Sequence, residues 1–191
     1  MKLSILICSL EEKRSFFRER LKDILDFQIT GWYRNEIEVL WEIDNGEMSI
    51  GSKRNSLLDK AKGEYLCFMD DDDRPSWDYV EKVIKALDTK PDCLSLQGVI
   101  TENGLKPKLF VHSLTYDRYY DEVNGFGQLE YFRFPNHLNV IKSSIAKQFR
   151  FPETNFGEDT DYATQIHKSG LLKTEVEIEG IIYNYDYIPN K

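Results

Sequence analysis

The sequence predicts an α/β fold, a three-layer α/β/α sandwich around a mostly parallel central sheet. Short apolar runs alternate with segments whose apolar residues recur at helical spacing. This order of strand and helix is typical of βαβ units with right-handed crossovers. The 191 residues fit one domain, and no internal repeat or low-complexity linker divides them. We therefore expect residues 1–191 to fold as a single unit.

The first half of the chain contains the clearest elements. Residues 3–8 are a continuous apolar run typical of a buried parallel strand, and residues 17–28 carry apolar side chains at helical spacing. Residues 36–43 alternate in polarity and stop at Asp44-Asn45-Gly46, a strong turn signal. We expect a helix at 51–63, a buried strand at 64–69, a capped helix around 80–87 and a fourth strand at 93–100.

The second half is less regular. Residues 109–114 and 137–141 are expected strands, and residues 144–149 a short helix. Residues 115–134 are rich in aromatic, glycine and acidic residues, which suits a mobile loop that closes over a ligand. A helix is expected over 155–168, and one or two strands over 172–187.

Four consecutive aspartates, Asp70 to Asp73, follow the buried strand. Two like charges about 4 Å apart repel by roughly 4 kcal/mol at an effective dielectric constant near 20, so a cation would stabilise the cluster. Magnesium and manganese prefer oxygen ligands, and ligands of open α/β sheets bind at the carboxyl ends of strands. Asp44 ends another strand at the same predicted edge. The alternative is a solvated acidic turn in which Ser76 caps the next helix.

Composition excludes several classes of function and location. The net charge of −8 and the pI of about 5.0 argue against a nucleic-acid surface or an anionic membrane as the main partner, although a nucleotide can bind through a metal ion. The N-terminal apolar run is too short for a signal peptide, and no stretch is apolar enough to span a bilayer. The three cysteines lie in apolar runs without metal-ligand spacing, so we expect reduced thiols and a cytoplasmic location.

The order of these motifs resembles glycosyltransferase family 2, the nucleotide-sugar-dependent transferases of GT-A fold. That family has an apolar first strand, an aspartate after the second strand, a Gly-x-x-x-Arg-Asn-like helix, an Asp-x-Asp motif and a late Glu-Asp pair. The corresponding positions here are residues 5–9, Asp44, Gly51 to Asn55, Asp70 to Asp73, and Gly157-Glu158-Asp159. The resemblance covers most of the chain.

The resemblance implies a role for each matched residue. Asp72 would ligate Mn²⁺ or Mg²⁺ directly, Asp70 and Asp73 would contact the ribose, the ion or its waters, and Asp44 would bind the base, most commonly uracil. The implied nucleotide-binding residues are Ser9, Asp44, Lys53, Arg54, Asn55, Asp70 and Asp71, and the implied metal ligands are Asp72 and Asp73. Residues 1–100 would form the nucleotide-sugar-binding half, and residues 101–191 the acceptor-binding and catalytic half.

The late Glu-Asp pair would perform the chemistry. Asp159, at a helix N-terminus, would be the general base of an inverting transfer from a nucleotide-sugar and would take the proton of the acceptor hydroxyl. Glu158 would orient Asp159 or bind the acceptor. The residues alone also allow simpler interpretations: Asp159 as a helix-capping acid, Asp44 as a turn former, and Lys53 and Arg54 as a solvated helix face.

The chain departs from the family pattern in its tail. Asn184 stands in Tyr183-Asn184-Tyr185 where related enzymes often have a metal-binding histidine, and an asparagine oxygen is a weaker ligand. His137 is the remaining histidine in a plausible site element, although a structural role suits it better. The chain is short for the family, which favours a soluble acceptor or a partner protein that supplies it. The oligomeric state stays open.

Three other functions are compatible with parts of the pattern. A non-catalytic relative that only binds nucleotide-sugar would share every motif. A nucleotidyltransferase would also use paired aspartates, but its glycine-rich basic loop is missing after the first strand. A helix-loop-helix calcium site requires alternate ligand spacing and a downstream glutamate, which the aspartate run lacks.

Overall fold

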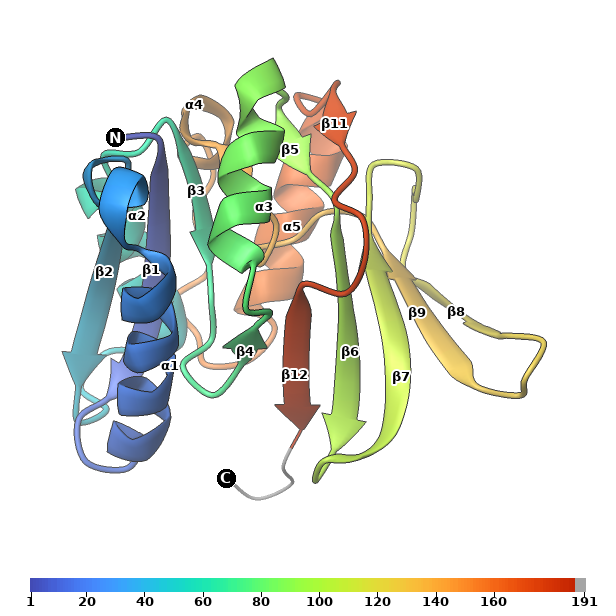
Figure 1. The fold of residues 1–191 in the computed structure, drawn as a ribbon, viewed down its shortest axis with the longest axis horizontal. Helices are drawn as coiled ribbons and strands as arrows, with labels where there is room; N and C mark the ends of the chain where they lie inside the picture. Colours follow the sequence, from blue (N-terminus) through green and yellow to red (C-terminus); the bar gives the residue numbers. More distant parts are fainter. Residues whose placement is uncertain (188–191) are drawn as a thin grey trace.

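The computed structural model describes residues 1–187 and arranges their strands in two six-stranded sheets (Figure 1). The strand order is β11-β5-β10-β3-β1-β2 in the first sheet and β4-β12-β6-β7-β9-β8 in the second. The first sheet contains β1 (Leu3–Leu10), β2 (Ile37–Asp44), β3 (Tyr65–Phe68), β5 (Cys93–Leu94), β10 (Ile141–Lys142) and β11 (Glu175–Val176). The second contains β4 (Arg74–Pro75), β6 (Leu96–Glu102), β7 (Leu105–His112), β8 (Tyr120–Val123), β9 (Leu129–Arg133) and β12 (Tyr183–Tyr187).

The parallel strands β1, β2 and β3 form the centre of the first sheet. Leu3 lies beside Ile37 on one side and Tyr65 on the other, and Leu10 lies beside Asp44 at the far end. The apolar run of β1 is buried because both faces of the sheet are covered by helices. The carboxyl ends of the three strands therefore meet at one edge, which confirms that Asp44 and the aspartate run share that edge.

Helices cover both faces of this sheet. They are α1 (Ser15–Gln28), α2 (Ile50–Lys60), α3 (Tyr79–Ala86), α4 (Ser143–Ala146) and α5 (Glu158–Ser169), with the short 3-10 helices η1 (Gly31–Asn35) and η2 (Leu87–Thr89). Leu21 of α1 and Val83 of α3 pack on the face that carries Ile5, whereas Leu57 of α2 packs on the face that carries Leu6. Adjacent strand residues point to opposite faces, so two separate cores form. The predicted three-layer α/β/α architecture is confirmed.

The sequence does not predict the second sheet, and one expectation within it is wrong. Residues 115–134, expected as a loop, contain the β-hairpin of β8 and β9. Tyr120 stacks on Phe132 across the hairpin, with ring centroids 5.1 Å apart. The side chain of Asn124 accepts hydrogen bonds from the amides of Phe126 and Gln128 and so forms the turn.

Two further predicted strands differ from the structure. The strand expected at 93–100 divides at Ser95 into β5 and β6, which belong to different sheets. Most of the strand expected at 137–141 is a turn, because the Asn139 side chain accepts a hydrogen bond from the amide of Asn136, and only Ile141 enters β10. The tail forms two strands, β11 and β12, as expected.

The cysteines and the helices agree with the expectations from composition. Cys8, Cys67 and Cys93 are free thiols, and burial raises the pKa of the Cys67 thiol to about 12. Within residues 1–187, every helix is too short or too polar to cross a bilayer.

Candidate active site

The aspartate run turns immediately after β3, so its four side chains point in different directions. The amide of Asp73 donates to the carbonyl of Asp70 across a tight turn, with N and O 3.1 Å apart. Asp70 and Asp73 line a cavity of about 300 Å³ between the two sheets, which we call the aspartate cavity. Asp71 and Asp72 instead face α1, where both form ion pairs with Arg14.

Arg14 holds the middle of the run. Its Nε lies 2.7 Å from Oδ1 of Asp71, and its Nη2 lies 2.8 Å from Oδ1 of Asp72. The hydroxyl of Ser9 also donates to Asp71, with Oγ and Oδ2 2.6 Å apart. Burial of Asp71 nevertheless raises the pKa of its carboxyl, and the hydrogen bonds from Arg14 and Ser9 partly oppose that rise. Asp71 and Ser9, both predicted to bind the nucleotide, thus bind each other and do not line the aspartate cavity.

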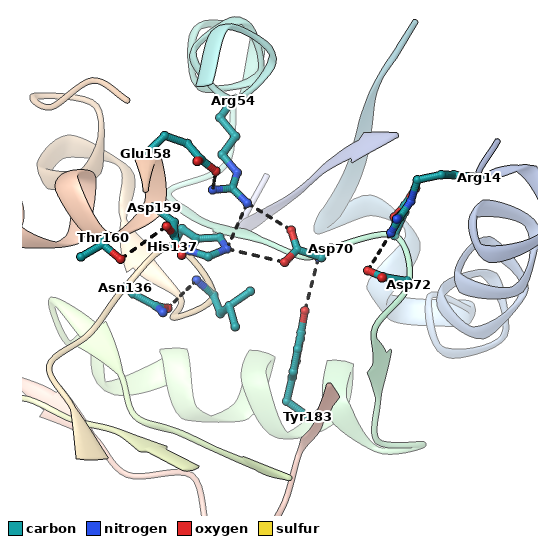
Figure 2. Close-up of polar contacts among 12 residues, drawn as sticks. Arg14, Arg54, Asp70, Asp72, Asn136, His137, Glu158, Asp159, Thr160 and Tyr183 are labelled. Atoms are coloured by element: carbon teal, nitrogen blue, oxygen red, sulfur yellow. Dashed lines mark hydrogen bonds and ion pairs between the residues drawn. The ribbon is translucent and has the colours of Figure 1, made fainter. Parts of the chain in front are cut away.

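Arg54 connects the two acidic motifs (Figure 2). Its guanidinium lies 2.8 Å from a carboxylate oxygen of Glu158 and 3.1 Å from one of Asp70, and its Nη2 lies 3.3 Å from Nε2 of His137. Arg54 is 5% exposed, so it is no solvated helix residue. Burial alone would raise the pKa of the Asp70 carboxyl, but His137 and Arg54 reverse the sign and hold that pKa well below its usual range.

Asp44 and the buried Lys53 form a second ion pair at the same edge. Lys53 is 2% exposed, forms an ion pair with Asp44, and donates to the carbonyl oxygen of Ser9 2.8 Å away. The Asp44 carboxylate also accepts hydrogen bonds from the amides of Gly46 and Met48, at 3.0 and 2.7 Å. Asp44 therefore forms the turn that its position before Asn45-Gly46 suggested, and its base-binding role stays a prediction.

Glu158 and Asp159 open α5, as predicted, but they face different surroundings. Glu158 is buried and bound to Arg54, whereas Asp159 lines the aspartate cavity. Gly157 precedes them in a left-handed conformation with φ of 77°, which turns the chain into the helix.

The sequence pattern assigned roles to two asparagines that the structure places elsewhere. Both ends of the Asn55 amide bind the backbone of Phe151, at 2.9 and 3.0 Å, so this side chain anchors a loop. Asn184 donates to the carbonyl of Arg74, 3.2 Å away, on the face of β12 opposite to Tyr185, which lines the aspartate cavity. The Asn184 side chain therefore does not line the cavity, where a metal-ligating side chain from the tail would be needed.

Several residues that line the cavity had no clear signal in the sequence. Tyr131 and Arg133 come from β9, and the alternation in Leu129–Arg133 could have revealed this strand. His112 also lines the cavity, and burial lowers its pKa to about 3, so its imidazole is neutral at pH 7. His137 is buried and its Nδ1 has no hydrogen-bond partner among the described residues. These side chains come from elements distant in the sequence.

The aspartate cavity offers oxygen ligands of the kind that magnesium and manganese prefer. Such ions are often held by one or two carboxylates together with substrate phosphates, and Asp70 and Asp73 supply two carboxylates to one cavity. Within residues 1–187, no group of three or more histidine, cysteine and acidic side chains converges as a complete metal site. The donor set therefore fits an ion that is shared with a diphosphate.

Comparisons with known proteins identify the family and the fold. Residues 43–151 match the family described as Glycosyl transferase family 2. The fold is similar to that in the crystal structure of S. aureus TarS 1-349, with a TM-score of 0.70 at 17% sequence identity over 97% of this chain and 60% of that chain. The crystal structure of TarS 1-349 in complex with UDP-GlcNAc gives a TM-score of 0.71 at 14% identity over 100% of this chain and 60% of that chain. The complex of the same protein with UDP gives TM-score 0.70 at 16% identity, covering 99% and 61%.

The limits of these matches are also clear. The chain spans about 60% of the length of the TarS 1-349 structures, and identities of this size establish the fold alone. The search of curated protein sequences gave no match.

Proposed function

Because this chain belongs to glycosyl transferase family 2, we propose that it transfers a sugar from a nucleotide-diphosphate sugar, most simply a UDP-sugar, to an acceptor hydroxyl. The observation that carries the proposal is the aspartate cavity, where Asp70 and Asp73 from the first sheet's edge face Asp159 from α5. The crystallised TarS complexes contain UDP-GlcNAc and UDP, which supports UDP as the nucleotide.

The donor would bind at the carboxyl edge of β1, β2 and β3. In this proposal residues 1–100 form the donor half, with Asp44 toward the base, and residues 101–191 form the acceptor half. Lys53 and Arg54 are buried in ion pairs, so they would position Asp44, Asp70 and Glu158 for the donor. The free thiols are consistent with a reducing, cytoplasmic environment.

A divalent ion, Mn²⁺ or Mg²⁺, would supply positive charge to the departing diphosphate. Asp73 is suited to hold it from the cavity wall, with Asp70 beside it. Asp72 remains our second proposed ligand, and its carboxylate would exchange Arg14 for the ion when the donor binds.

Asp159 would act as the general base of an inverting transfer. Its carboxylate takes the proton of the acceptor hydroxyl while that oxygen forms a bond to the anomeric carbon and the bond from that carbon to the diphosphate breaks. Glu158, fixed by Arg54 at 2.8 Å, would orient the start of α5 so that Asp159 faces the cavity.

Replacing Asp159 tests this proposal. Asp159→Asn keeps the size of the side chain but removes the proton acceptor, so the transfer rate should fall by about 10² to 10⁴ with UDP affinity nearly unchanged. Asp161→Asn is the matched control, because Asp161 is an exposed acid in the same helical turn. Wild-type transfer rates in Asp159→Asn would contradict the role of Asp159. A wild-type protein that binds UDP-sugars but transfers none would favour the non-catalytic alternative.

A further inference from the structure

A second hollow lies on the opposite side of the strands that wall the aspartate cavity. We call it the aromatic groove, and it is the larger of the two, with a volume of about 630 Å³. It runs between α1 and the start of α3, and its walls include Asp23, Phe27, Arg74, Trp77 and Asn184. Figure 1 shows the neighbouring strands β4 and β12, and α1 on the other side of β4.

Two aromatic side chains in this groove are unusually open to solvent. Phe27 is 77% exposed and Trp77 is 79% exposed, whereas Leu21 and Leu25 of the same helix α1 are buried in the core. Phe27 therefore lies on the outer face of α1 and contributes little to the core. Large aromatic rings in a hollow are typical of binding sites rather than of ordinary surface.

The groove is built on a rigid frame. The Gln28 side chain donates to the carbonyl of Ser76 and accepts from the amide of Val80, both at 2.9 Å, and so fixes α1 against the start of α3. Asn184 donates to the carbonyl of Arg74 and fixes β12 against β4. These bonds hold the backbone of the groove's walls in place before any ligand arrives.

The polar groups of the groove indicate the chemistry of its ligand. Asp23 and Arg74 are both exposed and contribute one negative and one positive charge, so the groove favours a ligand without net charge. A carboxylate accepts hydrogen bonds from hydroxyl groups, and a guanidinium donates hydrogen bonds to them. Flat aromatic rings pack against apolar C–H surface. A neutral sugar ring presents hydroxyls on its rim and C–H groups on its faces, and it matches both features.

We propose that the aromatic groove is a second carbohydrate site, which holds a neutral oligosaccharide segment outside the aspartate cavity. Arg74 and Asn184 line the groove, whereas their neighbours Asp73 and Tyr185 line the aspartate cavity. A saccharide in the groove would therefore bind one strand layer away from the reacting groups. The proposal rests on the proposed function only in that a glycosyltransferase acts on carbohydrate.

The test measures saccharide binding by calorimetry with UDP present at saturation, so that the donor site is occupied. The probes are linear hexasaccharides of β-1,4-linked glucose, β-1,4-linked N-acetylglucosamine and α-1,4-linked glucose. We expect at least one to bind the wild-type protein. Trp77→Ala and Phe27→Ala should each weaken binding by at least about tenfold, as for buried aromatic contacts in other interfaces.

Two variants serve as controls. Trp77→Tyr keeps a flat ring and should stay within about threefold of the wild-type affinity. Phe126→Ala removes an aromatic side chain that is 92% exposed in the β8–β9 hairpin, outside the groove, and should leave saccharide binding unchanged. UDP affinity should be the same in all variants, because none of the substituted residues lines the aspartate cavity.

Several results would overturn the proposal. They are the absence of binding of all three hexasaccharides, unchanged binding in Trp77→Ala, and a wild-type dimer that Trp77→Ala converts to monomer, since a second copy of the chain would then cover the groove. Loss of saccharide binding with intact UDP binding and transfer would leave the proposed function standing. Absence of transfer with Trp77-dependent saccharide binding would refute only the proposed function.

Discussion

At the scale of single residues, the site depends on buried charges that hold one another in place. Arg54 lies between Glu158, Asp70 and His137 and is almost fully buried, so solvent water would not hydrate its guanidinium if an ion pair were lost. Removing one partner of such a group leaves an uncompensated charge, which destabilises a protein far more than loss of a surface pair. The same arginine therefore determines both the stability of α2 against α5 and the directions of two acidic motifs.

This difference predicts the stabilities of two arginine variants. Arg54→Met should lower the free energy of unfolding by about 3 to 5 kcal/mol, because Glu158 would keep a buried charge without its cation. Arg150→Met is the matched control: Arg150 pairs with Asp59 at 2.7 Å, but both side chains are more than half exposed, so the change should be about 0 to 1 kcal/mol. Urea denaturation at pH 7 measures both. Equal losses of unfolding free energy in the two variants would show that the buried ion pairs stabilise the protein no more than the exposed pair does.

The sequence predicted which residues gather at the site better than it predicted their directions. In a regular strand, alternation would put Asp70 and Asp72 on one face. The hydrogen bond from the Asp73 amide to the Asp70 carbonyl turns the chain, so Asp70 and Asp73 share the cavity instead. Four identical residues in a row carry no signal for such a turn. Arg14, which holds Asp71 and Asp72, likewise lies in a charged stretch without a pattern.

At the scale of elements, the sequence predicted what depends on local periodicity. β1, α1, β2, α2, β3 and α3 follow one another in the expected order because each buries an apolar face against its neighbour in sequence. The second sheet depends instead on pairings between distant segments, such as Tyr183 with Gly98 and with Pro75. Neither pairing leaves a signal in any short window. The hairpin of β8 and β9 is local, but the aromatic, glycine and acidic composition of residues 115–134 predicts a loop more readily than two strands.

The docking of α2 gives a prediction at this scale. Alanine normally stabilises a helix relative to glycine by roughly 0.5 to 1 kcal/mol. At Gly51 the sign should reverse, because an added Cβ would lie 1.8 Å from the carbonyl oxygen of Pro152. Gly51→Ala should therefore destabilise the protein by about 1 to 3 kcal/mol.

Thermal unfolding measures this effect, with Gly125→Ala as the control. A Cβ at Gly125 meets no atom within 4 Å, so that variant should stay within about 0.5 kcal/mol of the wild type. A Gly51→Ala protein as stable as the wild type would mean that the loop around Pro152 yields easily and does not fix the start of α2.

At the scale of the whole molecule, the charge distribution matters more than any single pair. The chain carries a net charge of −8, yet two of the cations beside the aspartate run are already committed: Arg14 to Asp71 and Asp72, and Arg54 to Glu158 and Asp70. A nucleoside diphosphate brings further negative charge to this edge. The arrangement therefore favours a ligand that arrives together with a metal cation.

This balance predicts that manganese and UDP stabilise the folded protein together. A ligand at 100 times its dissociation constant adds about 2.7 kcal/mol, or roughly 5 to 11 °C in melting temperature for a chain of this size. The shift in melting temperature with both ligands should exceed the sum of the shifts with each alone, and Asp73→Asn should remove most of the excess because Asp73 lines the cavity. Asp26→Asn, an exposed acid on α1, should keep it. Identical melting curves without ligand, with manganese, with UDP and with both would refute metal-dependent nucleotide binding, and an excess that survives in Asp73→Asn but disappears in Asp72→Asn would place the ion at Asp72.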